Sequence, residues 1–322
     1  MNKDVNTISA SRKEQGRVER FLKKNFTSWL YIVPVVLGIV LFTVIPMITS
    51  LSYAFRSYNP TLRGEDKYGG FTFGNFVTIF TAEPDGIWDT FRSSIGVTFG
   101  FTIISLALQI IGSYGVALFL NQKTKGIQGF RILYYLPNLI PAVAGTMLWA
   151  NMTDDRGGYL NSLLDIFGLS FPFYSDPNTV LPTLLIINIF TWGGTAIMWL
   201  SQMQNIPKEM YESAELDGAN YFTQTIKITI PMSTSMMFYV IVTSMIGGIQ
   251  AFTNVYPLYS RYEGEAKLNF IVVYIYNNAF GAVENGMSMA CALAWVLFLI
   301  IAAMTFLLFK TSKKWVYYGE EM

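Results

Sequence analysis

Long apolar runs, separated by short polar connectors, form the main pattern of this chain. A transmembrane helix rises ~1.5 Å per residue and needs ~20 apolar residues to cross the ~30 Å hydrocarbon core of a bilayer. Six runs meet this requirement, at residues 29–54, 94–120, 132–151, 180–203, 231–256 and 287–309. The pattern therefore predicts an all-α membrane protein with six transmembrane helices.

The first apolar run has some features of a signal peptide. Its length exceeds that of a signal-peptide core, and residues 56–60 after it (Arg-Ser-Tyr-Asn-Pro) offer no small-residue cleavage site. We therefore expect it to remain as a transmembrane helix. Pro34 and Pro46 lie within it, and a spanning helix tolerates proline where neighbouring groups satisfy the freed carbonyls.

The composition agrees with a membrane protein and excludes several kinds of chemistry. Hydrophobic residues make up 52% and charged residues 13% of the 322 residues, whereas soluble domains carry about 25% charged residues. The net charge of +1 provides no basic field for nucleic acid. The chain has no histidine and one cysteine, Cys291, which we expect to be a packing residue. Histidine-based metal sites and Ser/His or Cys/His catalysis are excluded, and we expect no metal, cofactor or enzymatic activity.

The distribution of lysine and arginine predicts the orientation of the chain. The N-terminal tail, the second and fourth connectors and the C-terminal end together hold fifteen of these residues, and the opposite connectors hold seven. The positive-inside rule then places both termini and the connector 204–230 in the cytoplasm. The basic tail 1–28 either serves orientation alone or also forms a short interfacial helix with Val18, Phe21 and Leu22 facing lipid.

The predicted transmembrane helices contain no Asp, Glu, Lys or Arg. An ion-coupled secondary transporter usually keeps buried ionisable residues along its path, because such residues bind the coupling ion. Their absence argues against secondary transport, and it indicates a solute that is neutral or is screened by groups elsewhere. The chain also lacks a Gly-x4-Gly-Lys-Ser/Thr phosphate loop. We therefore expect that energy comes from another protein.

The connector between the fourth and fifth runs predicts a short cytoplasmic helix. Asn205 is a suitable N-cap, Pro207 suits a first turn, and Gly218 permits the left-handed residue that ends a helix. Glu209 and Glu212 lie near the positive end of the helix dipole. A second helical piece is predicted over 221–230. On spacing alone, the first helix is either a docking element or a surface helix without a partner.

A sequence motif distinguishes these two alternatives. Residues 212–231 read Glu-Ser-Ala, three residues, Gly, nine residues, Ile-Thr-Ile-Pro. This pattern resembles the signature of the inner-membrane permease subunits of binding-protein-dependent ABC importers, which reads Glu-Ala-Ala-x3-Gly-x9-Ile-x-Leu-Pro. Ser213 and Ile230 depart from that signature, and both are close in size to the family's residues.

Other stretches extend the resemblance to most of the chain from about residue 25. Residues 30–52, 134–137, 206–212 and 314–318 resemble the carbohydrate-importer branch of the family. One departure concerns the fifth external connector, where that branch often carries a Gly-Gly-Pro turn. Here residues 261–267 read Arg-Tyr-Glu-Gly-Glu-Ala-Lys. This difference bears on the geometry of the connector and on its contact with a binding protein.

The resemblance implies a specific architecture. It implies a five-helix core plus a peripheral first helix, with a cytoplasmic coupling helix between transmembrane helices 4 and 5, in a bacterial inner membrane. The corresponding segments are a cytoplasmic tail 1–28, the first transmembrane helix with an external loop 29–92, the transport core 93–310 and a cytoplasmic tail 311–322.

The resemblance also implies partners. These are a second homologous permease subunit, two cytoplasmic ATP-binding subunits that hydrolyse ATP, an extracytoplasmic solute-binding protein and membrane lipid. The coupling residues are then Tyr211, Glu212, Ala214, Asp217 and Gly218. Glu212 is expected to pair with a basic group of the ATPase, and Gly218 to allow the turn that seats the helix.

Sugars are recognised by amides, hydroxyls and aromatic rings. On this basis, the candidates for the solute path are Asn188, Trp192, Gln250, Asn254 and Tyr256. Gln250 and Asn254 are four residues apart, which predicts that they share one helix face. The alternative is that these side chains hold helices together or lie in an aromatic belt.

The sequence leaves two other questions open, namely the structure of residues 269–280 and the choice between several functional classes. The apolar stretch 269–280 is short for a span and is predicted to be re-entrant or interfacial. The main functional alternatives are an ion-coupled secondary transporter of a neutral solute and an ABC permease for a non-sugar solute such as glycerol phosphate. The latter would need cationic groups from the partner subunit. A membrane enzyme or scaffold is a third class.

Overall fold

The computed structural model describes residues 26–58, 67–81, 86–122, 124–262, 265–281 and 286–317. These residues are mostly helical, with two short strands. The predicted interfacial helix around Phe21 and most of the basic tail 1–28 lie outside the described residues, as do positions 263–264 of the fifth external connector and Tyr318.

Three helices in the described part of the chain are long and apolar enough to cross a membrane without a break. The first runs from Leu30 to Ala54 and consists of α2 (Phe26–Ile39), the π-helical segment η1 (Val40–Val44) and α3 (Ile45–Ala54). The others are α5 (Ile87–Leu120) and α17 (Gly286–Ser312). The last two extend beyond the predicted ends of their apolar runs.

The other three predicted spans are bent helix pairs. The first pair consists of α6 (Ile127–Tyr135) with η3 (Leu136–Leu139), followed after a bend of 95° by α7 (Ala142–Met152). In the second pair, α9 (Pro177–Ile189) and α10 (Gly193–Gln204) enclose a bend of 48°. The third pair bends by 61° between a segment made of α12 (Tyr221–Gln224), η4 (Thr225–Thr229) and α13 (Ile230–Met232), and the helix α14 (Thr234–Ile249). With each pair counted as one span, the described residues contain up to six.

Prolines explain the sharpest bend. Pro141 precedes α7 and forces the residue before it, Ile140, into an extended conformation with ψ of 127°. The chain therefore leaves the helical direction at this point.

Two π-helical segments accompany prolines elsewhere in the chain. Ile45 and Ile230, each directly before a proline, donate their N–H to Val40 and Thr225, five residues back. A proline inside an α-helix removes a hydrogen bond and its ring meets a carbonyl of the preceding turn. One wider turn before the proline relieves that clash. The second helical piece, predicted to end at residue 230, thus continues through Pro231 to Met232.

Helix α14 ends at Ile249, and Gln250–Val255 form turns before α15 (Tyr256–Arg261) begins. The prediction that Gln250 and Asn254 share one helix face is therefore wrong. Pro257 gives the physical reason, because in a continuous helix its ring would clash with the carbonyl of residue 253. Here the helix breaks in the turn before Pro257.

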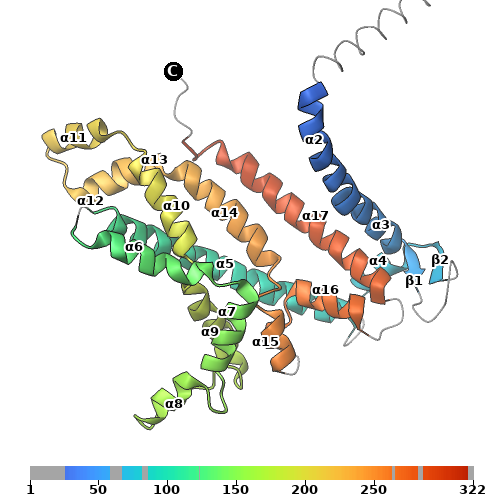
Figure 1. Ribbon diagram of the computed structural model, residues 1–322. Coiled ribbons are helices and arrows are strands. Elements are labelled where there is room, and N and C mark those ends of the chain that lie inside the picture. The colour runs from blue at the N-terminus through green and yellow to red at the C-terminus, as the bar shows by residue number, and fades with distance from the viewer. Residues whose placement is uncertain are drawn as a thin grey trace, which may run out of the picture.

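The first spanning helix lies at the edge of the molecule. Its α2 portion stands apart from the other helices, and α3 packs against α17 (Figure 1). Trp295 of α17 donates its indole N–H to the hydroxyl of Ser50 at 3.2 Å. Beyond α3, the antiparallel strands β1 (Arg56–Tyr58) and β2 (Tyr68–Phe71) precede α4 (Gly74–Phe80).

Helix α5 is central to the packing, with α9, α10, α14 and α16 (Ile271–Phe280) against it. Gly248 of α14 allows a close approach, because a Cβ there would lie 2.7 Å from Cγ2 of Thr102. The hydroxyl of Thr98 accepts the N–H of Ile271 at 2.9 Å and so holds the start of α16. The short stretch predicted to be re-entrant or interfacial thus packs into the core, with Ile271 and Val273 fully buried.

Three further short helices complete the described structure. They are α8 (Tyr159–Asp165), α11 (Lys208–Leu216) and the 3-10 turn η5 (Ala266–Leu268). Helix α11 lies at the end of the molecule where α17 ends, opposite the two strands (Figure 1).

Candidate functional site

The short helix α11 ends as its sequence predicts. Gly218 adopts φ of +80°, in the left-handed region. Its N–H donates to the carbonyl of Glu215, and the N–H of Ala219 donates to that of Ala214, both at 2.9 Å. This is the Schellman arrangement that satisfies the last carbonyls of a helix.

The start of α11 differs from the prediction. Asn205 ends α10 by donating its N–H to Ser201, and Pro207 occupies the N-cap position of α11. The helix therefore begins at Lys208, later than expected. The chain needs the intervening residues to turn from α10 into α11.

One hydrogen bond ties α11 to the next segment. The hydroxyl of Tyr211 lies 3.0 Å from that of Thr229, in the π-helical segment η4. Glu212 and Asp217 are exposed, Ala214 is half-buried, and Leu216 is 90% exposed. The outer face of α11 is therefore exposed, while its inner face is attached to the segment that leads into α14.

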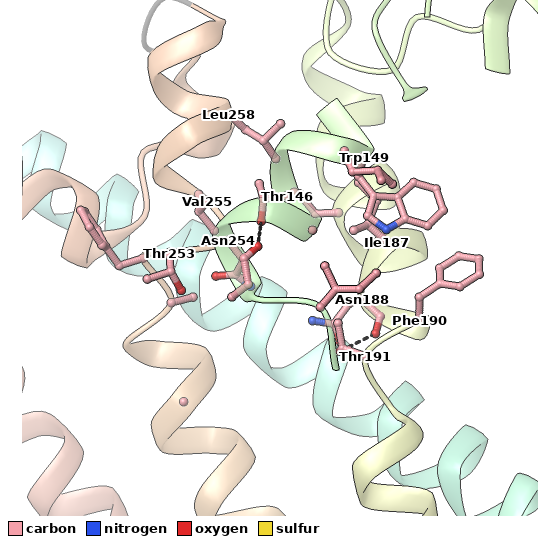
Figure 2. A pocket seen from close by; sticks show the side chains of 18 of the residues that line it. Thr146, Trp149, Ile187, Asn188, Phe190, Thr191, Thr253, Asn254, Val255 and Leu258 are labelled. Atoms are coloured by element: carbon pink, nitrogen blue, oxygen red, sulfur yellow. Dashed lines mark hydrogen bonds between the residues drawn. The ribbon is translucent and has the colours of Figure 1, made fainter. Parts of the chain in front are cut away.

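A cavity of about 410 Å³, called the central cavity below, lies where the bent helices meet the unwound segment after α14 (Figure 2). Its polar side chains are three amides and three hydroxyls, namely Asn188, Gln250, Asn254, Thr146, Thr191 and Thr253. Its aromatic side chains are Phe101, Trp149, Phe190 and Phe252. None of the residues that line it is Asp, Glu, Lys or Arg. Such a cavity suits a neutral ligand with many hydroxyl groups.

The structure brings three of the five predicted path residues into this cavity: Asn188, Gln250 and Asn254. Trp192 is buried behind it, and its indole N–H donates to the side-chain oxygen of Asn188 at 3.0 Å. Trp192 also fits closely against α5, because a Cβ on Gly112 would lie 2.2 Å from its ring. Trp192 therefore orients Asn188 and lies behind the cavity wall.

Sequence reasoning missed the contribution of α7. Thr146 and Trp149 of this helix line the central cavity, together with Pro137 from the turn before it. The signal was the pair Pro137 and Pro141 inside an apolar run. In membrane proteins, such interrupted helices occur where the backbone lines a cavity.

A second cavity, of about 550 Å³, lies between α7 and α15 and is called the outer cavity below. It contains the remaining path candidate, Tyr256. The residues that line it are Val143, Met147, Ala150, Asn151, Phe252, Thr253, Tyr256, Pro257, Ser260 and Arg261.

Arg261 is held in place at the outer cavity. Its guanidinium donates to the carboxylate of Asp154 at 2.5 Å and to the side-chain oxygen of Asn151 at 2.7 Å. The backbone N–H of Arg156 and then the Arg261 guanidinium hold the pKa of Asp154 below its ordinary value, against the opposing effect of burial. This ion pair joins the segment after α7 to the end of α15.

No group of three or more His, Cys, Asp or Glu side chains in the described residues is arranged to hold a metal ion. The chemistry available in both cavities is hydrogen bonding and contact with aromatic rings.

Comparison with known proteins finds relatives whose names describe them as permease proteins of transport systems. YesP of Bacillus subtilis strain 168, a probable ABC transporter permease protein, is 32% identical over 301 residues, which cover 92% of this chain and 93% of YesP. AraP of the same strain, an arabinooligosaccharides transport system permease protein, is 27% identical over 96% of this chain and 95% of its own length.

Solved structures and a family model extend this result. A chain in the crystal structure of a bacterial alginate ABC transporter, in complex with an alginate pentasaccharide-bound periplasmic protein, superposes with a TM-score of 0.78 at 21% identity. The match covers 92% of this chain and 98% of that one, so the two share a fold. Residues 109–313 match the family described as binding-protein-dependent transport system inner membrane component. The chain belongs to this family of inner-membrane transport components.

Proposed function

We propose that this chain is a permease subunit of an ATP-driven importer that translocates a sugar or oligosaccharide delivered by an extracytoplasmic binding protein. The observation that carries the substrate class is the central cavity, in which three amides and three hydroxyls converge without a charged side chain. Hydroxyl-rich neutral solutes satisfy such groups. The name of AraP refers to an oligosaccharide, and the name of the alginate transporter refers to an acidic polysaccharide, so both support a sugar as the solute.

The proposed layout has six transmembrane helices, three of them bent, with the first at the periphery of a five-helix core. Residues 29–92 hold the first helix and its external loop, residues 93–310 form the core, and 1–28 and 311–322 are cytoplasmic tails of a protein of the bacterial inner membrane. The excess of lysine and arginine supports this orientation. So does the position of α11 at the end of the molecule where α17 ends (Figure 1).

Helix α11 is proposed to couple this subunit to an ATPase. Two ATP-binding subunits would carry out hydrolysis, and each would receive one such helix, the other coming from a second homologous permease. Exposed Glu212 and Asp217 offer charge to a partner, and Ala214 and Gly218 keep the helix end small. Tyr211 would transmit movement through its hydrogen bond to the segment that leads into α14.

The proposed path runs through the central cavity. Asn188, Gln250 and Asn254 would bind sugar hydroxyls, with Trp192 positioning Asn188. A glycerol phosphate would leave its charge without a partner among the lining residues, because none of them is cationic. Neutral sugars are therefore favoured over that alternative.

The test is uptake by the complete complex in proteoliposomes, with purified binding protein outside and ATP inside. Replacing Asn254 with alanine removes one neutral hydrogen bond, worth about 0.5–1.5 kcal/mol, so KM should rise about twofold to twelvefold. Asn278→Ala is the matched control, because this amide lies on α16 and bonds Tyr274 outside the cavity. Sugar uptake that continues without ATP and stops when an ion gradient is dissipated would instead indicate a secondary transporter.

A further inference from the structure

The outer cavity has the features of a second binding site. We propose that it is a sugar subsite that holds the unit next to the one in the central cavity, so that this permease grips two stretches of an oligosaccharide. The inference rests on the proposed function, and it adds a second place at which the permease contacts the oligosaccharide.

The two cavities are neighbours on either side of α7. Ala142, Thr146 and Trp149 line the central cavity, and their spacing of four and three residues defines one helix face. Val143 and Met147 line the outer cavity from the adjacent face. The cavities meet at the unwound segment after α14, because Phe252 and Thr253 line both. The two cavities are therefore adjacent, and the proposed subsite places successive units of a linear oligosaccharide in both.

Aromatic rings form one wall of the outer cavity. The rings of Phe252 and Tyr256 stack with centroids 4.9 Å apart and an interplanar angle of 20°. Tyr276 of α16 packs edge-on against Tyr256, also at 4.9 Å. These contacts fix the rings in place, and a fixed aromatic surface suits the apolar face of a pyranose or furanose ring.

Polar groups lie at the same cavity. Asn151, Ser260 and Arg261 supply hydrogen-bonding groups around the aromatic wall. The Arg261 guanidinium is already oriented by Asp154 and Asn151, and its five N–H donors exceed those two bonds. A side chain oriented before binding loses little freedom when a ligand arrives.

The charge of Arg261 is balanced by Asp154, so the site has no unpaired charge to attract an anion. The ligand we assign is therefore a neutral sugar unit. The volume of about 550 Å³ lies within the ~300–1,000 Å³ of ordinary small-molecule sites. The consequence is a preference for chain length: longer oligosaccharides use both cavities, whereas a monosaccharide uses the central one.

The experiment measures uptake by the complete reconstituted complex across three sugar ladders of one to six units. Maltodextrins and arabino-oligosaccharides are the neutral ladders, and alginate oligosaccharides are the acidic ladder. Tyr256→Leu removes the aromatic wall, and Asn254→Ala perturbs the central cavity. Tyr159→Leu is the matched control, because this tyrosine is exposed on α8 and lines neither cavity.

We expect Tyr256→Leu to raise KM about twofold to twelvefold for neutral chains of two or more units, with monosaccharides unchanged. Asn254→Ala should raise KM at every length. Ser260→Ala, an exposed position, repeats the length test if Tyr256→Leu fails to assemble. Equal effects of the outer variants at all lengths, no effect at any length, or an effect confined to the acidic ladder would overturn the subsite. Failure of the wild-type complex to import any ladder member would instead contradict the proposed function.

Discussion

The turn at Gly218 provides a sharp test of the coupling helix. A Cβ at this position would meet no atom of the chain within 4 Å, so a side chain meets no steric obstacle within this subunit. The cost within the subunit comes from φ of +80°, which ordinary residues adopt at about 1–2 kcal/mol. That penalty concerns the end of a short surface helix, so the membrane-embedded part should still fold and assemble.

We therefore predict that Gly218→Asp yields an intact complex that hydrolyses ATP but imports sugar at least about tenfold more slowly. The reason is that, in the proposed coupling role, the turn must stay small for α11 to fit into the ATPase. Gly218→Asn and Gly218→Ala separate the two contributions, because asparagine tolerates the left-handed region and alanine does not. If the size of the side chain at position 218 decides, Gly218→Asn should slow sugar import as much as Gly218→Asp does.

The assay compares ATP hydrolysis with uptake in the same vesicles, after checking subunit stoichiometry by gel filtration. If Gly218→Ala loses sugar uptake while Gly218→Asn transports normally, backbone strain alone explains the loss of uptake. Normal transport by Gly218→Asp would refute the assignment of this helix as the coupling element.

Three further predictions follow from other contacts. Tyr211→Phe removes the hydrogen bond to η4, worth about 0.5–1.5 kcal/mol, and should lower the sugar moved per ATP hydrolysed while leaving assembly unchanged. Gly112→Ala should displace Trp192 and disorder its amide partner, raising KM for uptake, whereas alanine at Gly115, with open space around it, should not. Asp154→Asn should lower Tm slightly at pH 7, since a partly exposed ion pair contributes about 0.2–1 kcal/mol. The pKa of Asp154 is lowered in the folded state, so the ionised carboxylate stabilises the fold at pH values above its ordinary pKa of ~3.9. This contribution is lost as the pH falls through the folded-state pKa. Plots of Tm against pH for the wild type and Asp154→Asn should therefore converge in acid.

Local features of the chain were predictable where one residue decides the outcome. Gly218 ends α11 in the left-handed region, as expected, because few other residues adopt it without strain. Apolar runs located the spans because hydrocarbon thickness sets their length.

The bends were less predictable, since hydropathy reports composition rather than direction. Gln250 and Asn254 reach the same cavity from an unwound segment, although helical spacing was the reason for pairing them. Pro257 was the feature of the sequence that could have indicated the break in the helix before it. The position of Trp192 behind Asn188 depends on the close fit to Gly112 of another helix, which no local pattern reports.

The unwound stretch after α14 also presents main-chain hydrogen-bond donors, whose presence does not depend on the identity of the side chains. Within the described residues, no carbonyl accepts the main-chain N–H of Phe252, Thr253 or Asn254. Thr253 lines both cavities and Asn254 lines the central one, and both residues are exposed, so in the proposed path their amides are available to bond water or a solute hydroxyl. In the proposed path, substitution of the lining side chains would therefore change which sugar is preferred, while these main-chain donors would stay the same.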